Sequence, residues 1–399
     1  MNRKVNLGTT VLLCVLSAVV AFMSAWTITR IDYKMQMNEM YLKYPEAVKL
    51  MEVMKYFEEN YVGELDEELL EEAVLKGYVS ATGDRYGTYY TPDEYRTLLK
   101  EDNGELVGIG VFVSYEDERG ISIQWVMPDS PAQKGGLKKG DLIIGVDGKS
   151  EGYTNKELSQ MIAGKEGTEV TLSILSDGEE KELTLKRATV VMDSVFSQYI
   201  EDEKIGFIRI FTFDNTTPEQ FRNALKKMKA EGAESFIFDL RNNGGGLMSS
   251  LMEVLGSLLP DNSLYATANF KDGTVKEYKV KNGSEFDYPA VVLMNRNTAS
   301  AAELFTAALK DYGVVTTVGE NSFGKGIMQS IVSLRDGSAL KLTTAYYQSP
   351  NGKNYDGKGL APDIEADPGD DYIIKSFELD MDDPTVSAGI NALKENKGQ

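Results

Sequence analysis

The chain of 399 residues carries 42 Lys or Arg against 62 Asp or Glu, and its net charge of −20 argues against nucleic-acid binding, which needs bulk basic surface. With 42% hydrophobic and 26% charged residues it has a globular composition, and its length suggests roughly two to three domains. A single cysteine, Cys14, and the lack of histidine exclude internal disulfides, Cys-rich zinc sites, Ser-His-Asp triads and nearly every His-ligated metal centre.

Residues 7–28 form an uncharged run, LGTTVLLCVLSAVVAFMSAWTI. At about 1.5 Å per residue, a helix of this length crosses the roughly 30 Å hydrocarbon core of a membrane. Arg3 and Lys4 precede the run, and Trp26 lies near its far end, where interfacial aromatic residues are common. We therefore predict a transmembrane anchor after a short cytoplasmic stretch, residues 1–6. A cleaved signal peptide is the alternative, although its apolar region is typically only about 7–15 residues long.

Residues 29–104 are expected to form a helical region. Apolar residues recur at three- and four-residue spacing in YPEAVKLMEVMKYFEENYV and again in DEELLEEAVLKGYVSA, a pattern typical of amphipathic helices. Such helices can pack on the rest of the chain or on a second copy. The motif GDRYGTYYTPDEY then adds turns and a cluster of tyrosines.

Residues 105–187 are rich in predicted β-strands. DSPAQKGGL indicates a short helix capped by Ser130, DLIIGVDGKS a strand ending in an Asp-Gly turn, and TEVTLSILSDGEEKELTLKR a hairpin that turns at Asp177-Gly178. The GIGV loop, the SPAxxxGL helix and the GDLIIGVDG strand occur in the order found in PDZ domains, which this segment resembles.

The resemblance implies that a peptide carboxy-terminus docks here by adding a strand to the sheet. Its carboxylate would be held by backbone N–H groups near Gly108, Ile109, Gly110 and Val111. The alternative is a PDZ fold that serves only as an interaction or packing module.

Residues 188–399 are expected to form an α/β core with a mixed, largely parallel sheet. Apolar strands alternate with helices, as in KIGFIRIFTF, TPEQFRNALKKMKAEG, ESFIFDLRNNGGG and PAVVLMNRNTASAAELFTAALKDYG. The predicted fold class is therefore α/β plus β: a membrane anchor, a helical N-terminal region, a PDZ domain and an α/β core.

Two turns follow strands of this core, where sites in such sheets usually lie. The first is RNNGGG, whose glycines let backbone N–H groups approach an oxyanion. The second places Ser300 at the start of a helix among small alanines. Taken alone, each has an ordinary structural explanation, a tight turn in one case and an N-cap serine in the other.

A third motif, NSFGKGIMQ, places Lys325 between two glycines. A lysine acts as a general base only when its pKa falls from about 10.4 towards 7, which partial burial away from carboxylates produces. This segment has no acidic residue after Glu320, and Gln329 is spaced to hydrogen-bond the amine. The alternative is a surface lysine in a glycine turn.

Together and in this order, the motifs resemble the C-terminal processing peptidases, also called tail-specific proteases, over nearly the whole soluble part. The match includes GDRYGTYYTPDEY, the PDZ motifs, FDLRNNGGGL, NTASAAELFTAAL, GENSFGKGIMQS and LKLTTAYYQSPNGKNYDGKGLAPDI. The resemblance implies that Ser300 is the nucleophile, Lys325 the general base and Gln329 its orienting partner. It places the oxyanion hole at the N–H of Ala301 together with that of Gly245 or Gly246.

The chain departs from the family pattern at two positions. Gly244 stands where proline is common, which loosens the turn. Ala163 stands where the family often has an arginine that couples docking to the active site, so the coupling here either uses Lys165 or differs in kind. Ser322 and Lys325 also spell the SxxK signature of β-lactamases, but the glycines around Lys325 disfavour the helix that this signature needs.

The sequence therefore predicts a membrane-anchored Ser/Lys endopeptidase with its catalytic part on the extracytoplasmic side. We expect it to process unfolded or flexible C-terminal tails of proteins under the control of its PDZ domain, without a metal or organic cofactor. A homodimer is expected, with residues 41–99 and the C-terminal PTVSAGINALKENK helix as candidate contacts. The alternative function is a catalytically inactive PDZ adaptor on a protease fold.

Overall fold

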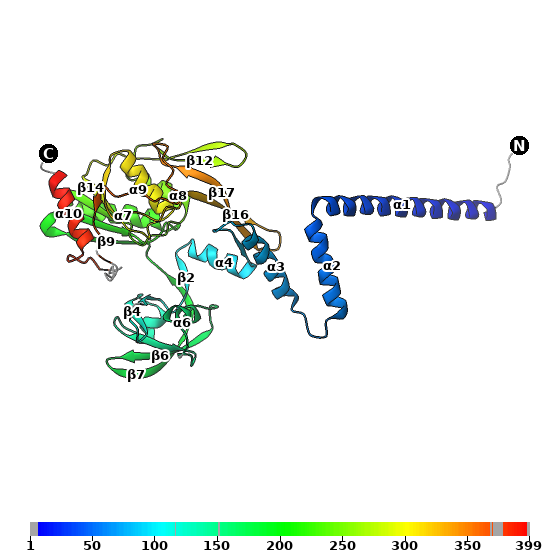
Figure 1. Ribbon diagram of the computed structural model, residues 1–399, viewed down its shortest axis with the longest axis horizontal. Coiled ribbons are helices and arrows are strands. Elements are labelled where there is room, and N and C mark those ends of the chain that lie inside the picture. Colours follow the sequence, from blue (N-terminus) through cyan, green and yellow to red (C-terminus); the bar gives the residue numbers. More distant parts are fainter. Residues whose placement is uncertain (1–6, 116, 151, 368, 370–377, 397–399) are drawn as a thin grey trace. The chain divides into compact units, whose positions relative to one another are not determined.

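The structure, a computed structural model, describes residues 7–115, 117–150, 152–367, 369 and 378–396 (Figure 1). The expected cytoplasmic stretch, residues 1–6, lies outside them. The chain divides into two compact units, residues 1–75 and residues 76–399.

The first unit begins with two consecutive helices, α1 (Leu7–Lys43) and α2 (Pro45–Asn60). Helix α1 contains an apolar span, Val11–Ile31, that is long enough to cross a membrane by length and composition, and none of it is buried. The helix continues past residue 28, the expected end of the anchor, because residues 29–44 contain no glycine or proline. Helix α3 (Glu67–Ala81) leads from this unit into the second one.

The core of the second unit is a six-stranded sheet in the order β18-β15-β14-β11-β10-β9. Its neighbouring strands are parallel except for β9 and β10, which are antiparallel. The strands are β9 (Val195–Ile200), β10 (Ile205–Ile210), β11 (Ser235–Asp239), β14 (Ala290–Met294), β15 (Val315–Gly319) and β18 (Ile364–Glu365). This arrangement confirms the predicted α/β core with a mixed sheet.

Helices cover both faces of this sheet because its strands are apolar on both sides. Side chains such as Phe238 pack with α7 (Thr217–Glu231), α8 (Met248–Leu255) and α9 (Ala301–Asp311). Side chains of the opposite face, such as Ile237, pack with α10 (Pro384–Asn396). The apolar side chains of α10 are therefore buried in the core, which removes them from the expected dimer contact.

A second, antiparallel sheet has the order β1-β17-β12-β13, with β16 also paired to β17. Its strands are β1 (Thr88–Tyr90), β12 (Leu264–Phe270), β13 (Val275–Lys279), β16 (Ile327–Ser333) and β17 (Ala339–Gln348). Strand β1 lies within the region expected to be helical. It is extended because Thr-Tyr-Tyr favours strands and pairs with residues 339–341 of β17. Helix α4 (Pro92–Glu101) follows it.

The expected PDZ segment has its own sheet, β3-β4-β5-β6-β7, and its own apolar core. Its elements are β3 (Val111–Ser114), β4 (Ile121–Val126), α5 (Pro131–Lys134), β5 (Leu142–Val146), α6 (Asn155–Ile162), β6 (Glu169–Ser176) and β7 (Glu179–Lys186). The pair of β2 (Glu105–Gly108) and β8 (Ala188–Val191) joins the two ends of the segment. The hairpin turn at Asp177-Gly178 is confirmed, with φ of 53° and 83°.

Candidate active site

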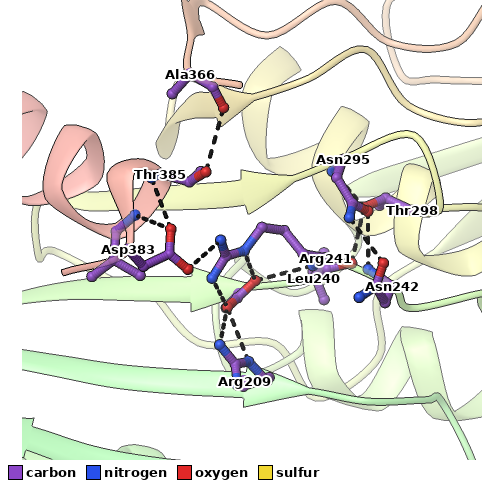
Figure 2. Close-up of polar contacts among 11 residues, drawn as sticks. Arg209, Leu240, Arg241, Asn242, Asn295, Thr298, Ala366, Asp383 and Thr385 are labelled. Carbon is purple, nitrogen blue, oxygen red and sulfur yellow. Dashed lines mark hydrogen bonds and ion pairs between the residues drawn. The ribbon is translucent and has the colours of Figure 1, made fainter. Parts of the chain in front are cut away.

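Two loops follow the neighbouring parallel strands β11 and β14, and side-chain amides join them (Figure 2). Asn295 accepts from the backbone N–H of Asn242 (3.0 Å) and donates to the Asn242 amide oxygen (2.9 Å). The Thr298 hydroxyl donates to the carbonyl of Leu240 (2.9 Å). The glycine-rich turn and the turn that leads to Ser300 are therefore held as one unit at the same edge of the sheet.

A buried charge network lies beneath these loops (Figure 2). Asp239, at the end of β11, is fully buried and accepts from the guanidinium groups of Arg209 and Arg241, and Arg241 also donates to Asp383 of the segment before α10 (2.7 Å). Burial acts to raise the pKa of Asp239, but the charges of Arg241 and Arg209 outweigh it, so the pKa lies below its ordinary value. The network fixes the direction in which the chain leaves β11.

Ser300 lies at the N-cap of α9 in an unusual backbone conformation, with φ of 57° and ψ of −120°. This conformation is strained for a residue with a side chain, and such strain is common at active sites. Gly245 packs directly on it: a Cβ at Gly245 would lie 2.7 Å from the Cβ of Ser300 and 2.9 Å from the nitrogen of Ala301. Only glycine fits beside the serine, which explains part of the glycine-rich motif.

The backbone N–H groups near Ser300 divide into bonded and open donors. The N–H of Gly245 donates to the side-chain oxygen of Asn243 (2.8 Å). Within the described part of the chain, the N–H groups of Gly246 and Ala301 have no hydrogen-bond acceptor. Of the two glycines named from the sequence, Gly246 therefore has the open donor.

Glu303, on the first turn of α9, connects Ser300 to the loop that contains Lys325 through hydrogen bonds. Its carboxylate is fully buried and accepts from the N–H of Ser300 (2.9 Å), the hydroxyl of Ser322 (2.5 Å) and the N–H groups of Gly324 (2.7 Å) and Lys325 (2.8 Å). Burial raises its pKa, although these hydrogen bonds act in the opposite direction. The expectation that Lys325 has no carboxylate neighbour is wrong, because α9 supplies one from outside the local segment.

Glu303 and the buried ion network did not emerge from the sequence motifs as site residues. The available signals were a carboxylate on the otherwise apolar helix SAAELFTAAL and two charges directly after a buried strand in FDLR. The SxxK alternative finds no support in the geometry, since residues 321–326 are not helical and the Ser322 hydroxyl is engaged by Glu303.

Lys325 is half-buried, and its Nζ lies 4.5 Å from the ring centroid of Tyr86. Burial lowers the pKa of the Lys325 amine most; the charge of Lys341 lowers it further, and that of Glu303 acts to raise it. No hydrogen bond among the described residues joins Nζ to the Ser300 hydroxyl. The lysine thus lies in the site with a pKa displaced in the direction a base requires, while its amine rests on an aromatic ring.

Tyr347 and Gln329 complete the surroundings of the lysine. The phenol of Tyr347 donates to the Lys325 carbonyl (2.5 Å) and is buried, which raises its pKa; Glu303 adds to this rise and the nearby Ser300 hydroxyl opposes it. Gln329 lies on β16 next to a register shift, and its buried side-chain nitrogen has no partner among the described residues. Its expected hydrogen bond to the amine of Lys325 is not formed in this structure.

The four predicted docking residues, 108–111, lie together in a cleft of about 920 Å³. β3 is the edge strand of its sheet, and α6 and α4 also line the cleft. Gly110 has φ of 79°, and a Cβ there would lie 2.4 Å from the Cβ of Ser130, so the loop requires glycine. Ala163 and Lys165 also line this cleft.

Comparison with known proteins places these features in a family. Residues 204–366 match peptidase family S41, and residues 122–176 match the PDZ domain. The chain is 32% identical over 321 residues to the carboxy-terminal processing protease CtpA of Bacillus subtilis (strain 168), a match that covers 80% of this chain and 68% of that protein. It is 31% identical over 358 residues to a CtpA-like serine protease of Staphylococcus aureus (strain N315), covering 86% and 71%.

Solved structures share the fold. The photosystem II D1 C-terminal processing protease is similar with a TM-score of 0.53 at 26% identity, over 86% of this chain and 90% of that one. An S41 protease from Bacteroides fragilis NCTC 9343 has a TM-score of 0.56 at 20% identity, over 85% and 91%.

Proposed function

The chain belongs to peptidase family S41, a family of serine peptidases, and we propose that it is a Ser/Lys endopeptidase with Ser300 as nucleophile and Lys325 as general base. The observation that carries this proposal is the pair of hydrogen bonds from the backbone N–H groups of Ser300 and Lys325 to one carboxylate, that of Glu303. Two loops distant in sequence are thereby fixed to each other at the residues whose side chains would react.

The reaction follows from the groups around Ser300. The neutral amine of Lys325 takes the hydroxyl proton as Oγ attacks the scissile carbonyl, and the open N–H groups of Gly246 and Ala301 stabilise the oxyanion. The resulting ammonium of Lys325 then protonates the leaving amine, and water hydrolyses the acyl-enzyme. Gln329 would orient the amine by hydrogen bonding. The amine must leave the Tyr86 ring to start this sequence.

The substrate is a flexible C-terminal tail of a protein, and residues 105–187 form the PDZ domain that gates its processing. The cleft beside β3 supports this proposal because it combines the edge strand of the PDZ sheet with the loop 108–111. An extended tail would add to β3, and backbone N–H groups of the loop would hold its carboxylate.

We also propose a single-pass membrane protein with its catalytic part on the extracytoplasmic side. The apolar span of α1 supports the anchor by length and composition. The proposed homodimer would use α2, where apolar side chains such as Met51, Met54 and Phe57 are exposed.

The test is cleavage of an unfolded reporter by the full chain in detergent. Ser300→Ala and Lys325→Ala are expected to abolish cleavage without loss of fold, whereas Lys358→Ala, a matched change at an exposed lysine, should keep the wild-type rate. Cleavage by Ser300→Ala at the wild-type rate would remove the assignment of the nucleophile, and the same result for Lys325→Ala would remove that of the base.

A further inference from the structure

The aromatic ring in contact with the Lys325 amine is that of Tyr86, which is distant from Lys325 in sequence. Tyr86 lies between α3 and β1, in the motif GDRYGTYY. The segment is anchored on β17, because the Asp84 carboxylate accepts from the N–H (2.7 Å) and the hydroxyl (2.8 Å) of Thr343 and because β1 pairs with the same strand. The position of Tyr86 is therefore set by several independent bonds.

The Lys325 amine lies over the face of the Tyr86 ring. Nζ lies 4.5 Å from the Tyr86 centroid, and within the described residues it forms no hydrogen bond or ion pair. An aromatic face attracts an ammonium and has little attraction for a neutral amine. Tyr86 therefore favours the protonated form of the lysine, which is the form that cannot act as a base.

Other charges around this amine act through space from several elements. Lys341 of β17 repels the ammonium and Glu303 of α9 attracts it. The guanidinium of Arg85 lies 5.6 Å from the centroid of the same Tyr86 ring and places a second positive charge near it. Asp356 accepts from the N–H of Gly326 (3.0 Å), next to the lysine. None of these groups bonds to Nζ, so Tyr86 is the direct contact that sets where the amine rests.

We propose that Tyr86 is a positioning residue that holds the protonated amine of Lys325 in a resting position and keeps it from Ser300 until the amine loses its proton. This inference rests on the proposed function, because it assigns a resting state to the proposed base. It also gives the region before the PDZ domain a direct part in the active site: the base is restrained by a residue from that region.

The experiment compares Tyr86→Phe, Tyr86→Leu and Tyr86→Trp with the wild type in the full chain. The pH dependence of kcat/KM reports the pKa of the free enzyme's base. Leucine has no π face to favour the ammonium, so Tyr86→Leu should lower the midpoint by about 0.5 pH unit and raise the rate about threefold at pH values well below that midpoint. Tyr86→Phe should keep the wild-type midpoint, and Tyr86→Trp should raise it.

A second readout is independent of catalysis. In the Ser300→Ala background, acetylation of Lys325 by acetic anhydride, followed by mass spectrometry as a function of pH, reports the same pKa. Equal labelling midpoints for wild-type Tyr86 and Tyr86→Leu would overturn the inference even if the protein cleaves its substrate. Conversely, shifted midpoints in a protein whose Lys325→Ala variant still cleaves would support the resting contact and reject the proposed base. If Tyr86→Leu does not fold, equal midpoints for the Phe and Trp variants overturn the inference.

Discussion

At the scale of single residues, the proposed site is held together by a buried carboxylate, that of Glu303. Glu303 has no solvent exposure and receives hydrogen bonds from both loops that carry the proposed chemistry. A buried carboxylate is costly unless its oxygens are fully engaged, and here four donors engage them. The charge therefore acts as a fixed point between the Ser300 backbone and the Lys325 backbone.

Glu303→Gln tests this role. The amide nitrogen would face N–H donors, so we expect the free energy of unfolding to fall by about 1–3 kcal/mol. We expect kcat/KM to drop up to about 100-fold, because a small misplacement of the reacting groups has an effect of that size. Because the charge of Glu303 raises the pKa of Lys325, its loss should move the midpoint of the pH–rate profile downward. Urea unfolding and pH profiles check this, and an unchanged or higher midpoint contradicts it.

A substitution at Lys341 should shift the pKa of Lys325 in the opposite direction. Burial lowers the pKa of Lys325 most and the Lys341 charge lowers it further, so Lys341→Met should raise that pKa. Activity is lost as the amine becomes protonated, so the variant should need a higher pH for the same rate and be less active near neutrality. The measurement is the pH dependence of kcat/KM, with exposed Lys353→Met as the control. Overlapping profiles for the two variants would show that the charge of Lys341 does not affect the pKa of Lys325.

Sequence motifs are enough to propose Ser300 and Lys325 as site residues because each stands in a short, characteristic run of neighbours. Glu303 and Tyr86 could not be assigned in this way. The roles proposed for them rest on contacts with Lys325, which is distant from both in sequence, and only the fold makes those contacts. The same reason explains why the open donor of Gly246 could not be distinguished from the bonded one of Gly245.

At the scale of elements, the two loops above β11 and β14 work as one piece. The glycine-rich turn supplies the space that Ser300 requires, and the amide pair of Asn242 and Asn295 fixes the spacing between the turns. Neighbouring glycines of the turn nevertheless differ in the space available for a side chain, so the same substitution at two of them should have different effects.

Gly245→Ala and Gly244→Ala form such a pair. A Cβ at Gly245, where φ is 104°, would clash with Ser300 and Ala301, whereas a Cβ at Gly244 would meet nothing within 4 Å. We expect Gly245→Ala to lose at least about 100-fold in kcat, because a small misplacement of reacting groups has an effect of that size. Gly244→Ala should stay within about twofold of the wild-type rate, since surface substitutions cost about 0.5 kcal/mol or less. Equal activities would show that the close packing on Ser300 is unimportant.

Asp383 connects α10 to the charge network below the loops. One of its oxygens accepts from the N–H groups of Thr385 (2.8 Å) and Val386 (3.2 Å), and the other pairs with Arg241. Asp383→Asn keeps the helix cap but removes the charge, and Asp383→Ala removes both. We expect losses in unfolding free energy of about 1–3 and about 3–5 kcal/mol, respectively. Urea unfolding measures both, and a loss below about 0.5 kcal/mol for Asp383→Ala would contradict the role of the network.

At the scale of the whole molecule, the proposed docking site and the proposed catalytic groups belong to different parts of one chain. The PDZ segment has its own apolar core, and the proposed catalytic groups lie on the α/β core and its antiparallel partner sheet. The sequence predicted both parts because each rests on continuous runs of local patterns. It did not predict that β1 joins the second sheet, since a three-residue strand gains its order from pairing with β17.

If docking and cleavage use separate parts of the chain, a substrate's carboxy-terminus should contribute to KM and not to kcat. If the loop 108–111 holds the tail carboxylate, amidation of that carboxylate removes a charged hydrogen-bond acceptor, a loss of about 1.5–3 kcal/mol. KM should then rise about tenfold or more, while kcat changes little because the proposed nucleophile, Ser300, does not line the cleft. Steady-state kinetics on matched reporters with free and amidated ends measures this. A short peptide that spans only the scissile bond should show no such difference, because it does not reach the cleft beside β3. Equal KM values for the two long reporters would mean that the carboxylate is not the feature by which the tail is recognised.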